Sequence, residues 1–128
     1  MGMATKIDPG WAWDDNIPLA QGIQAGNVLY ISGQIALDPD GKLVGAGDMR
    51  AQSQRVFENI EKLLAIAGFR LENVVKITAY LTDMSRFGEY NEVRGRFLKD
   101  HRPASTTVQV GALAFPGLLV EVEAIAQR

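Results

Sequence analysis

The stretch that decides the fold is DMRAQSQRVFENIEKLLAIAGFRLENVVKITAYLT, residues 48–82, because its hydrophobic period changes once along its length. Over residues 48–68 apolar side chains recur at the 3.6-residue spacing of a helix, with charged side chains on the other faces. Asp48 is a good N-cap, and Gly68 suits a left-handed C-terminal position. Over residues 73–82 the period is two and β-branched residues are frequent. We therefore predict a long amphipathic helix followed by a strand.

Turn signals divide the rest of the chain into shorter elements. We expect strands over residues 27–32, 105–110 and 118–126 and a second helix over residues 85–99. Asp83 or Ser85 would cap this helix, and the HRP segment at 101–103 would end it. The predicted order is one or two strands, helix, strand, helix and two strands. This order is typical of an α+β fold with a single mixed sheet and both helices on one face.

The alternation along the predicted strands divides the sheet into two faces. We place an apolar set against the helices: Val75, Ile77, Ala79, Leu81, Val120, Val122, Ala124 and Ala126. We place a mixed set on the opposite face: Thr78, Tyr80, Ser105, Thr107, Gln109, Leu119, Glu121, Glu123 and Ile125. The mixed set is too apolar to be left in water and too polar for a core of its own. We therefore expect the second face to pack on another copy of the chain.

The composition narrows the function classes. The length of 128 residues fits a single domain, residues 1–128. A net charge of −2 has the wrong sign for binding phosphate backbones, so no nucleic-acid partner is expected. The chain has no cysteine and one histidine, His101, which argues against thiolate catalysis and against Cys-based or paired-His metal sites. No apolar run is long enough for a signal peptide or a membrane helix, so we expect a cytoplasmic protein with no membrane partner.

Five segments carry a resemblance to a known family. They are ISGQI at residues 31–35, NVVKIT at 73–78, YNEV at 90–93, HRPA followed by TTV at 101–108, and VEVEAIA at 120–126. Together they resemble the Rid family, also called YjgF or L-PSP endoribonuclease, over nearly the whole chain. The resemblance implies a chorismate-mutase-like fold and a homotrimer whose sheets form a central barrel. It also implies clefts for small molecules between the subunits.

The resemblance further implies an activity, the hydrolysis of reactive imines and enamines to ammonia and a 2-keto acid. We expect no metal and no organic cofactor for this reaction, because an iminium carbon is already electrophilic. Carried over onto this sequence, the catalytic residue that places or activates the water is Glu121. The same carry-over places ligand contacts at Gly33, at a strand end, and at Asn91 in the second helix. Ser32, Ser105 and Thr107 are further candidates for ligand contact.

Two positions depart from the family pattern. Ser105 stands where the family has an arginine that clamps the substrate carboxylate, and a neutral hydroxyl cannot replace a bidentate, charged fork. Leu19 stands where the family has a tyrosine, which makes that wall of the cleft more apolar. We therefore expect a non-archetypal ligand that is less anionic, or bulkier and more apolar, than a 2-imino carboxylate.

Several of these residues also have a plain structural interpretation. Glu121 can be one more charged residue on a solvent-touched strand, and Ser105 and Thr107 can be simple β-formers. For Asn91 we favour a structural role, because an amide near the inner stripe of a helix must find partners.

Three further aromatic residues also have open roles. His101 is better explained by the dipole of the preceding helix than by acid-base chemistry. Trp11 and Trp13 either line a cleft mouth or an interface, or belong to an exposed tail.

The leading interpretation is an imine or enamine hydrolase of the deaminase type, acting in an intersubunit cleft. The alternative is a non-catalytic trimer that binds a small metabolite in the same cleft. An endoribonuclease fits less well, because that chemistry needs acid-base groups and positive charge.

Overall fold

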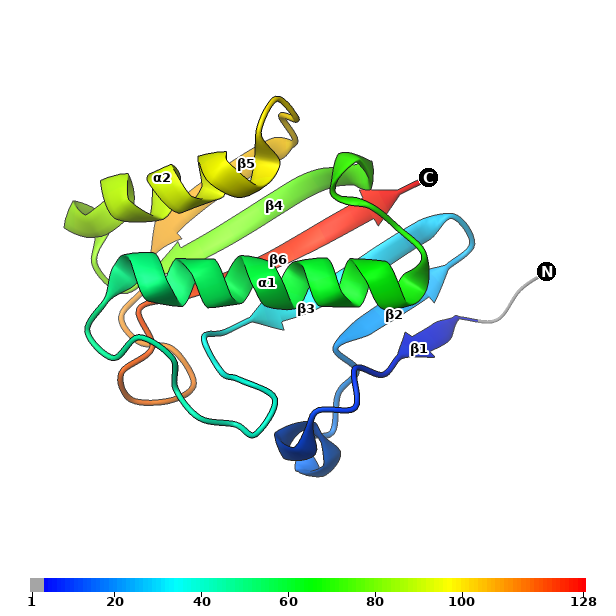
Figure 1. Ribbon diagram of the computed structural model, residues 1–128, viewed down its shortest axis with the longest axis horizontal. Coiled ribbons are helices and arrows are strands. Elements are labelled where there is room, and N and C mark those ends of the chain that lie inside the picture. The colour runs from blue at the N-terminus through cyan, green and yellow to red at the C-terminus, as the bar shows by residue number, and fades with distance from the viewer. Residues whose placement is uncertain (1–3) are drawn as a thin grey trace.

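Two helices cover one face of a six-stranded sheet in the computed structural model, which describes residues 4–128 (Figure 1). The strands are β1 (Thr5–Ile7), β2 (Gly22–Ala25), β3 (Val28–Gln34), β4 (Val74–Leu81), β5 (Ala104–Gln109) and β6 (Val120–Gln127). Their order across the sheet is β1-β2-β3-β6-β4-β5. Only β4 and β5 pair in parallel, so the sheet is mixed, as predicted.

The long helix α1 (Met49–Ala67) confirms the period read from the sequence. The carboxylate of Asp48 accepts a hydrogen bond from the backbone N–H of Ala51 at 3.0 Å. Gly68 ends the helix at φ 79°, a conformation that favours glycine. The apolar stripe of α1 is buried against β3 and β6, and the opposite side of the helix is exposed.

The second helix, α2 (Phe87–Leu98), begins two residues later than predicted. Asp83 caps a short 3₁₀ turn, η3 (Met84–Arg86), by accepting from the N–H of Ser85 at 3.0 Å. Two further 3₁₀ turns are η1 (Ala12–Asn16) and η2 (Leu71–Asn73). The two helices pack through stacked rings, because Phe57 of α1 lies 5.4 Å from Phe97 and 6.1 Å from Tyr90 of α2 between centroids.

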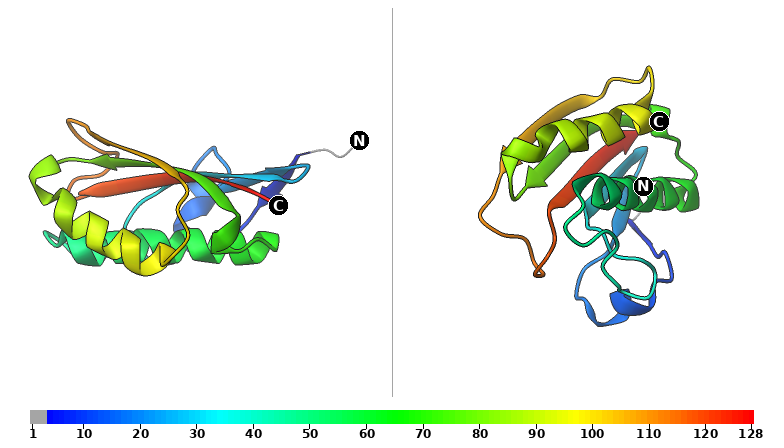
Figure 2. Two further views of the ribbon diagram at one scale, coloured as in Figure 1. Left: turned by 90° about the horizontal axis from the view of Figure 1, so that it is seen from above. Right: turned by 60° about the vertical axis from the view of Figure 1, so that its left-hand side comes forward.

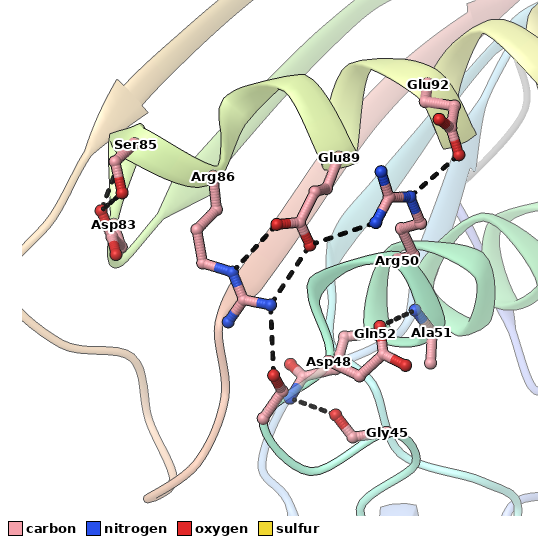
Figure 3. Close-up of polar contacts among 11 residues, drawn as sticks. Gly45, Asp48, Arg50, Ala51, Gln52, Asp83, Ser85, Arg86, Glu89 and Glu92 are labelled. Atoms are coloured by element: carbon pink, nitrogen blue, oxygen red, sulfur yellow. Dashed lines mark hydrogen bonds and ion pairs between the residues drawn. The ribbon is translucent and has the colours of Figure 1, made fainter.

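An exposed ion network joins the N-terminal end of α1 to α2 (Figure 3). Arg50 Nε lies 3.0 Å from a carboxylate oxygen of Glu92, and Arg86 Nη2 lies 3.2 Å from Glu89. Arg86 also donates to the carbonyl of Gly47, next to the Asp48 cap. These contacts are exposed or only partly buried, so each contributes little to stability, but together they hold the loop before α1 beside α2.

Two details of the predicted sheet faces are wrong. Val75 does not face the helices and is 45% exposed, because the register of β4 against β6 shifts at that point. In β5, Ser105 pairs with Ile77 and Thr107 with Ala79, so both share the helix-side face, and so does Gln109. A one-residue difference in strand phase moves every side chain to the other face.

The other predicted side-chain positions of the central strands are confirmed. Val120, Val122, Ala124 and Ala126 of β6 are buried on the helix side, and Glu121, Glu123 and Ile125 lie on the open face. Figure 2 shows both helices on one side of the sheet and no helix on the other. In the described residues, 4–128, no helix has the length and apolar character to cross a membrane.

Replacing Asp48 by Ala should remove the α1 cap and lower the free energy of unfolding by about 1 kcal/mol. The matched control is Asp40→Ala, an exposed aspartate in the preceding loop. Urea unfolding at one protein concentration measures both. Equal midpoints for the two variants would show that the cap contributes nothing.

Candidate functional site

A cavity of about 400 Å³ opens at the end of β3 that carries Gly33. The segment before β2, strands β3 and β6, and the loop before β6 all contribute to its wall. Its lining residues are Trp13, Ile17, Leu19, Gln21, Ser32, Gly33, Ile35, Ala114, Phe115 and Glu121. The lining is mainly apolar, and its single ionisable side chain is Glu121, so any acid-base chemistry in this cavity has to use that carboxylate.

Glu121 can enter the cavity only because residue 33 has no side chain. A Cβ atom at Gly33 would lie 2.7 Å from Cδ and 2.9 Å from Cγ of Glu121, closer than real contacts allow. The pairing of β3 with β6 shifts register between Ile31 and Gln34, so the backbone of β3 bulges at this position. The glycine therefore creates the space in which the carboxylate lies.

The surroundings of Glu121 disfavour its charge. Burial raises the pKa of this half-buried carboxyl, and the negative charge of Glu123 raises it further. No cation in residues 4–128 forms an ion pair with it. Glu123 itself accepts a hydrogen bond from Tyr80 on the neighbouring strand. Glu121 is thus a carboxylate without a counter-ion, and it is suited to accepting a proton.

A chain of buried polar side chains fixes the wall beside Gly33. Gln21 Nε2 donates to Asp14 Oδ1 at 2.7 Å, and Gln34 Nε2 donates to Gln21 Oε1 at 2.8 Å. All three side chains are buried. Ser32 ties the same wall to the preceding segment, because its hydroxyl donates to the carbonyl of Ala20 at 2.7 Å. Asp14, Gln21 and Gln34 are thus each hydrogen-bonded to another member of this buried group, which makes the segment before β2 a rigid wall.

The mouth of the cavity is apolar and open. Leu19 is 49% exposed and Phe115 is 45% exposed, although both are large hydrophobic residues. Trp13 stacks on the buried Trp11 at 5.7 Å between ring centroids. Exposed apolar side chains around a cavity are typical of a surface that binds a ligand or another protein.

The whole molecule resembles proteins that are already described. A family model named Endoribonuclease L-PSP matches residues 13–128. The chain belongs to this family. A RutC family protein of Pyrococcus horikoshii is 41% identical over 111 residues, which cover 87% of each chain. The mitochondrial protein Mmf1 of Saccharomyces cerevisiae is 36% identical over 124 residues, covering 97% of this chain and 81% of that protein.

Two solved structures of the family superpose closely on the fold. RidA from an Antarctic Psychrobacter has a TM-score of 0.88 at 38% identity, covering 97% of this chain and 99% of that one. E. coli TdcF, crystallised with bound serine, has a TM-score of 0.88 at 30% identity, covering 97% and 98%. At this identity and coverage the L-PSP fold holds for the whole described chain.

The L-PSP fold brings four of the predicted site residues into one cavity and leaves three elsewhere. Leu19, Ser32, Gly33 and Glu121 all line the cavity at the end of β3. The other three lie near α2 and β5, on the helix side of the sheet: Asn91, Ser105 and Thr107. In that region Arg94 donates to both the Ser105 hydroxyl and the Asn91 amide oxygen. One subunit therefore does not assemble all seven residues around one ligand.

Several residues that line the L-PSP cavity are not marked by any motif in the sequence. Gln21 and Phe115 were not among the predicted site residues; Gln21 lies two residues after Leu19, and Phe115 lies in the loop before β6. Trp13 was one of two tryptophans expected at a cleft mouth or interface, and it lines the cavity. A cluster of apolar residues around Pro116 was the available signal for Phe115.

The described residues contain no cluster of metal ligands, and His101 has a structural hydrogen bond. Among residues 4–128, no three His, Cys, Asp or Glu side chains lie close enough together to hold a metal ion. His101 Nε2 lies 2.6 Å from the carbonyl of Val74, to which it donates. The imidazole thus joins the end of α2 to the start of β4.

Gly33→Ala should destabilise the protein by about 1–3 kcal/mol, because the added methyl group overlaps the Glu121 side chain. In a Glu121→Ala background the same substitution should cost much less, because the overlapping atoms are gone. Urea unfolding of the four proteins in this double-mutant cycle gives the coupling. Equal costs in the two backgrounds would contradict the contact.

Proposed function

We propose that the chain hydrolyses a reactive imine or enamine, in a cleft that a neighbouring copy completes in a homotrimer. The carrying observation is the position of Glu121, half-buried, without a counter-ion, and directed by Gly33 into a cavity of about 400 Å³. Membership of the L-PSP family supports the same class of activity.

The reaction requires only that the protein position a water molecule and transfer protons. A water molecule attacks the electrophilic carbon of the C=N bond, and Glu121 accepts a proton from it as the C–O bond forms. The protonated imine thereby becomes a carbinolamine. Its nitrogen then takes up a proton, its hydroxyl loses a proton to solvent as the C=O bond forms, and the C–N bond breaks to release ammonia, so one protonated imine and one water give one carbonyl compound, one ammonia and one proton. Glu121 can return its proton to the leaving nitrogen, and one carboxylate with a raised pKa is enough for both transfers.

The bare face of the sheet supports the homotrimer. Tyr30 is 49% exposed on this face, and Val75 and Val108 also leave apolar surface in water. Strand β5 is the last strand of the sheet, so one of its edges pairs with no strand within residues 4–128. Three copies that bring these faces together would form a closed barrel. This packing would bury the apolar side chains and place the edge of each sheet against a neighbour.

The apolar lining supports a substrate with a larger apolar group than the archetypal small imines. Leu19, Ile17 and Phe115 would surround such a group, while Glu121 faces the reacting carbon. E. coli TdcF was crystallised with bound serine, which supports a ligand of amino-acid size for this chain. The cytoplasmic location remains a prediction, and the yeast relative Mmf1 is a mitochondrial protein.

A non-catalytic metabolite-binding trimer is the second candidate, and one observation favours it. The cavity offers a single ionisable group, and a binding site needs no more than that. The endoribonuclease activity in the family's name has less support, because His101 does not line the cavity and is bonded to the β4 backbone.

Light scattering coupled to size-exclusion chromatography should give about three times the 14.0 kDa chain mass at micromolar concentration. Ile125→Glu, on the open face, should shift the mass towards the monomer, because it buries an unpaired charge at the proposed interface. The control is Ile66→Glu, an exposed position on the outer side of α1. A monomeric wild-type protein would refute the trimer.

Glu121→Gln should lower ammonia release from imines by about 10²- to 10⁴-fold, the range typical for loss of a general base. The imines are generated in situ by an amino-acid oxidase, and ammonia is followed with a coupled dehydrogenase. Those derived from leucine should be better substrates than those derived from alanine, because the cleft is apolar.

The pH dependence of this rate has a definite sign. Glu121 must be ionised to accept a proton, so the rate falls as the pH drops through its pKa. Because burial raises that pKa, the fall begins at a higher pH than for an exposed glutamate. Turnover that is the same in wild type and Glu121→Gln would favour the binding protein.

A further inference from the structure

A second cavity, of about 380 Å³, lies beside the C-terminal half of α2 and the start of β5. Three of its lining residues are cationic, namely Arg94, Lys99 and Arg102, and His101 is a fourth basic residue. No carboxylate is among its lining residues, although the chain as a whole has a net charge of −2. Such a local excess of positive charge attracts anions.

The guanidinium of Arg94 is held in one place. It lies over the rings of Tyr90 and Phe87, 5.2 and 5.6 Å from their centroids. One Nη atom donates to the hydroxyl of Ser105 at 3.0 Å, and the other donates to the amide oxygen of Asn91. The two rings beneath the guanidinium and its two hydrogen bonds together fix its position.

Arg94 is nevertheless without a negative partner. Five other arginines of residues 4–128 pair with a carboxylate, and Arg94 does not. Burial raises the pKa of Tyr90 to about 12, so the phenol beneath the guanidinium stays neutral. A guanidinium has five N–H donors, and only two are used here. The remaining donors and the full charge are available to a ligand.

We propose that Arg94 binds the carboxylate of the substrate, and that it does so in the cleft formed by Glu121 of a neighbouring copy. This inference rests on the proposed function. A planar guanidinium with spare N–H groups matches a planar carboxylate in a bidentate contact. The expectation of a less anionic ligand, drawn from Ser105, is thereby replaced, because Ser105 serves to position an arginine that comes from α2.

A neighbouring copy is required because Arg94 and Glu121 lie on opposite faces of the sheet. Arg94 contacts the helix-side face of β5, whereas Glu121 lies on the open face of β6, and the two cavities share no residue. One subunit therefore cannot place both groups on one small molecule. Arg94 lies beside the unpaired edge strand β5, where a second copy can approach.

The first test is binding without turnover. Calorimetry compares 4-methyl-2-oxopentanoate with its neutral amide on wild type, Arg94→Gln and Arg94→Lys. Arg94→Gln should lower the affinity for the keto acid by about tenfold to a hundredfold and leave the affinity for the amide unchanged. Arg94→Lys keeps the charge but not the fork, so its loss should be smaller.

The control for this test is Arg96→Gln, on the same helix, which makes the same change in net charge at an exposed residue paired with Glu92. It should bind the keto acid like wild type. Equal losses in Arg94→Gln and Arg96→Gln, or a loss that includes the amide, would overturn the carboxylate contact. Inorganic phosphate that binds more tightly than the keto acid would also overturn it.

The second test places the two residues in different copies. Arg94→Gln and Glu121→Gln chains with different tags are co-expressed, and the mixed trimers are purified through both tags. Each mixed trimer would hold one cleft in three with both native residues, so about a third of the wild-type rate should return. No recovery would overturn the placement between copies.

The two tests separate this inference from the proposed function. If Arg94→Gln loses keto-acid binding but ammonia release does not depend on Glu121, the carboxylate site at Arg94 is supported and the proposed hydrolase activity is contradicted. Ammonia release that depends on Glu121 but not on Arg94 would do the opposite.

Discussion

The sheet is covered on one face and bare on the other, and most of the functional geometry depends on this asymmetry. On the helix side Leu29, Ala79 and Val122 have no exposed surface. On the other side Tyr30 and Val75 stay about half exposed. Each square ångström of apolar surface removed from water contributes about 25 cal/mol, so the bare face gives association a substantial driving force. Glu121 belongs to this face, and its cavity therefore borders the surface that would be covered in the proposed trimer.

The two sides of the cleft are held by different means. The wall formed by the segment before β2 is rigid within one chain, because Asp14, Gln21 and Gln34 form a continuous series of buried hydrogen bonds. The mouth has no such support, since Leu19 and Phe115 project into solvent. A neighbouring copy that covers these two residues would close the cleft without disturbing the wall. Binding and assembly would then be coupled through the mouth alone.

The sequence predicted the fold well, because helix periodicity and capping are local signals. Asp48, Gly68 and the apolar stripe between them placed α1 to the residue. The short strands β1 and β2 carry too few residues for a period to show, and β1 has only three. The phase of β5 was missed, since a run of small polar residues such as ASTTVQ gives no contrast between faces. Val75 was misplaced by a register shift that leaves no mark in the sequence.

The candidate site shows the same division between local and non-local information. Gly33 and Glu121 are recognisable from their motifs. The sequence does not show why residue 33 has to be glycine, because the Glu121 side chain that occupies the space beside it comes from β6. Arg94 shows still more clearly that a site residue can be recognised only from the three-dimensional structure. Ser105 occupies the position of the family arginine, so a comparison of sequences alone indicates that the positive charge has been lost. Such a comparison reports only where the Cα atom of a residue lies. A ligand responds to where the guanidinium lies, and the long side chain of Arg94 carries that group from α2 to the Ser105 hydroxyl. A function that depends on a charge at one point in space can therefore survive the loss of the residue that usually supplies it.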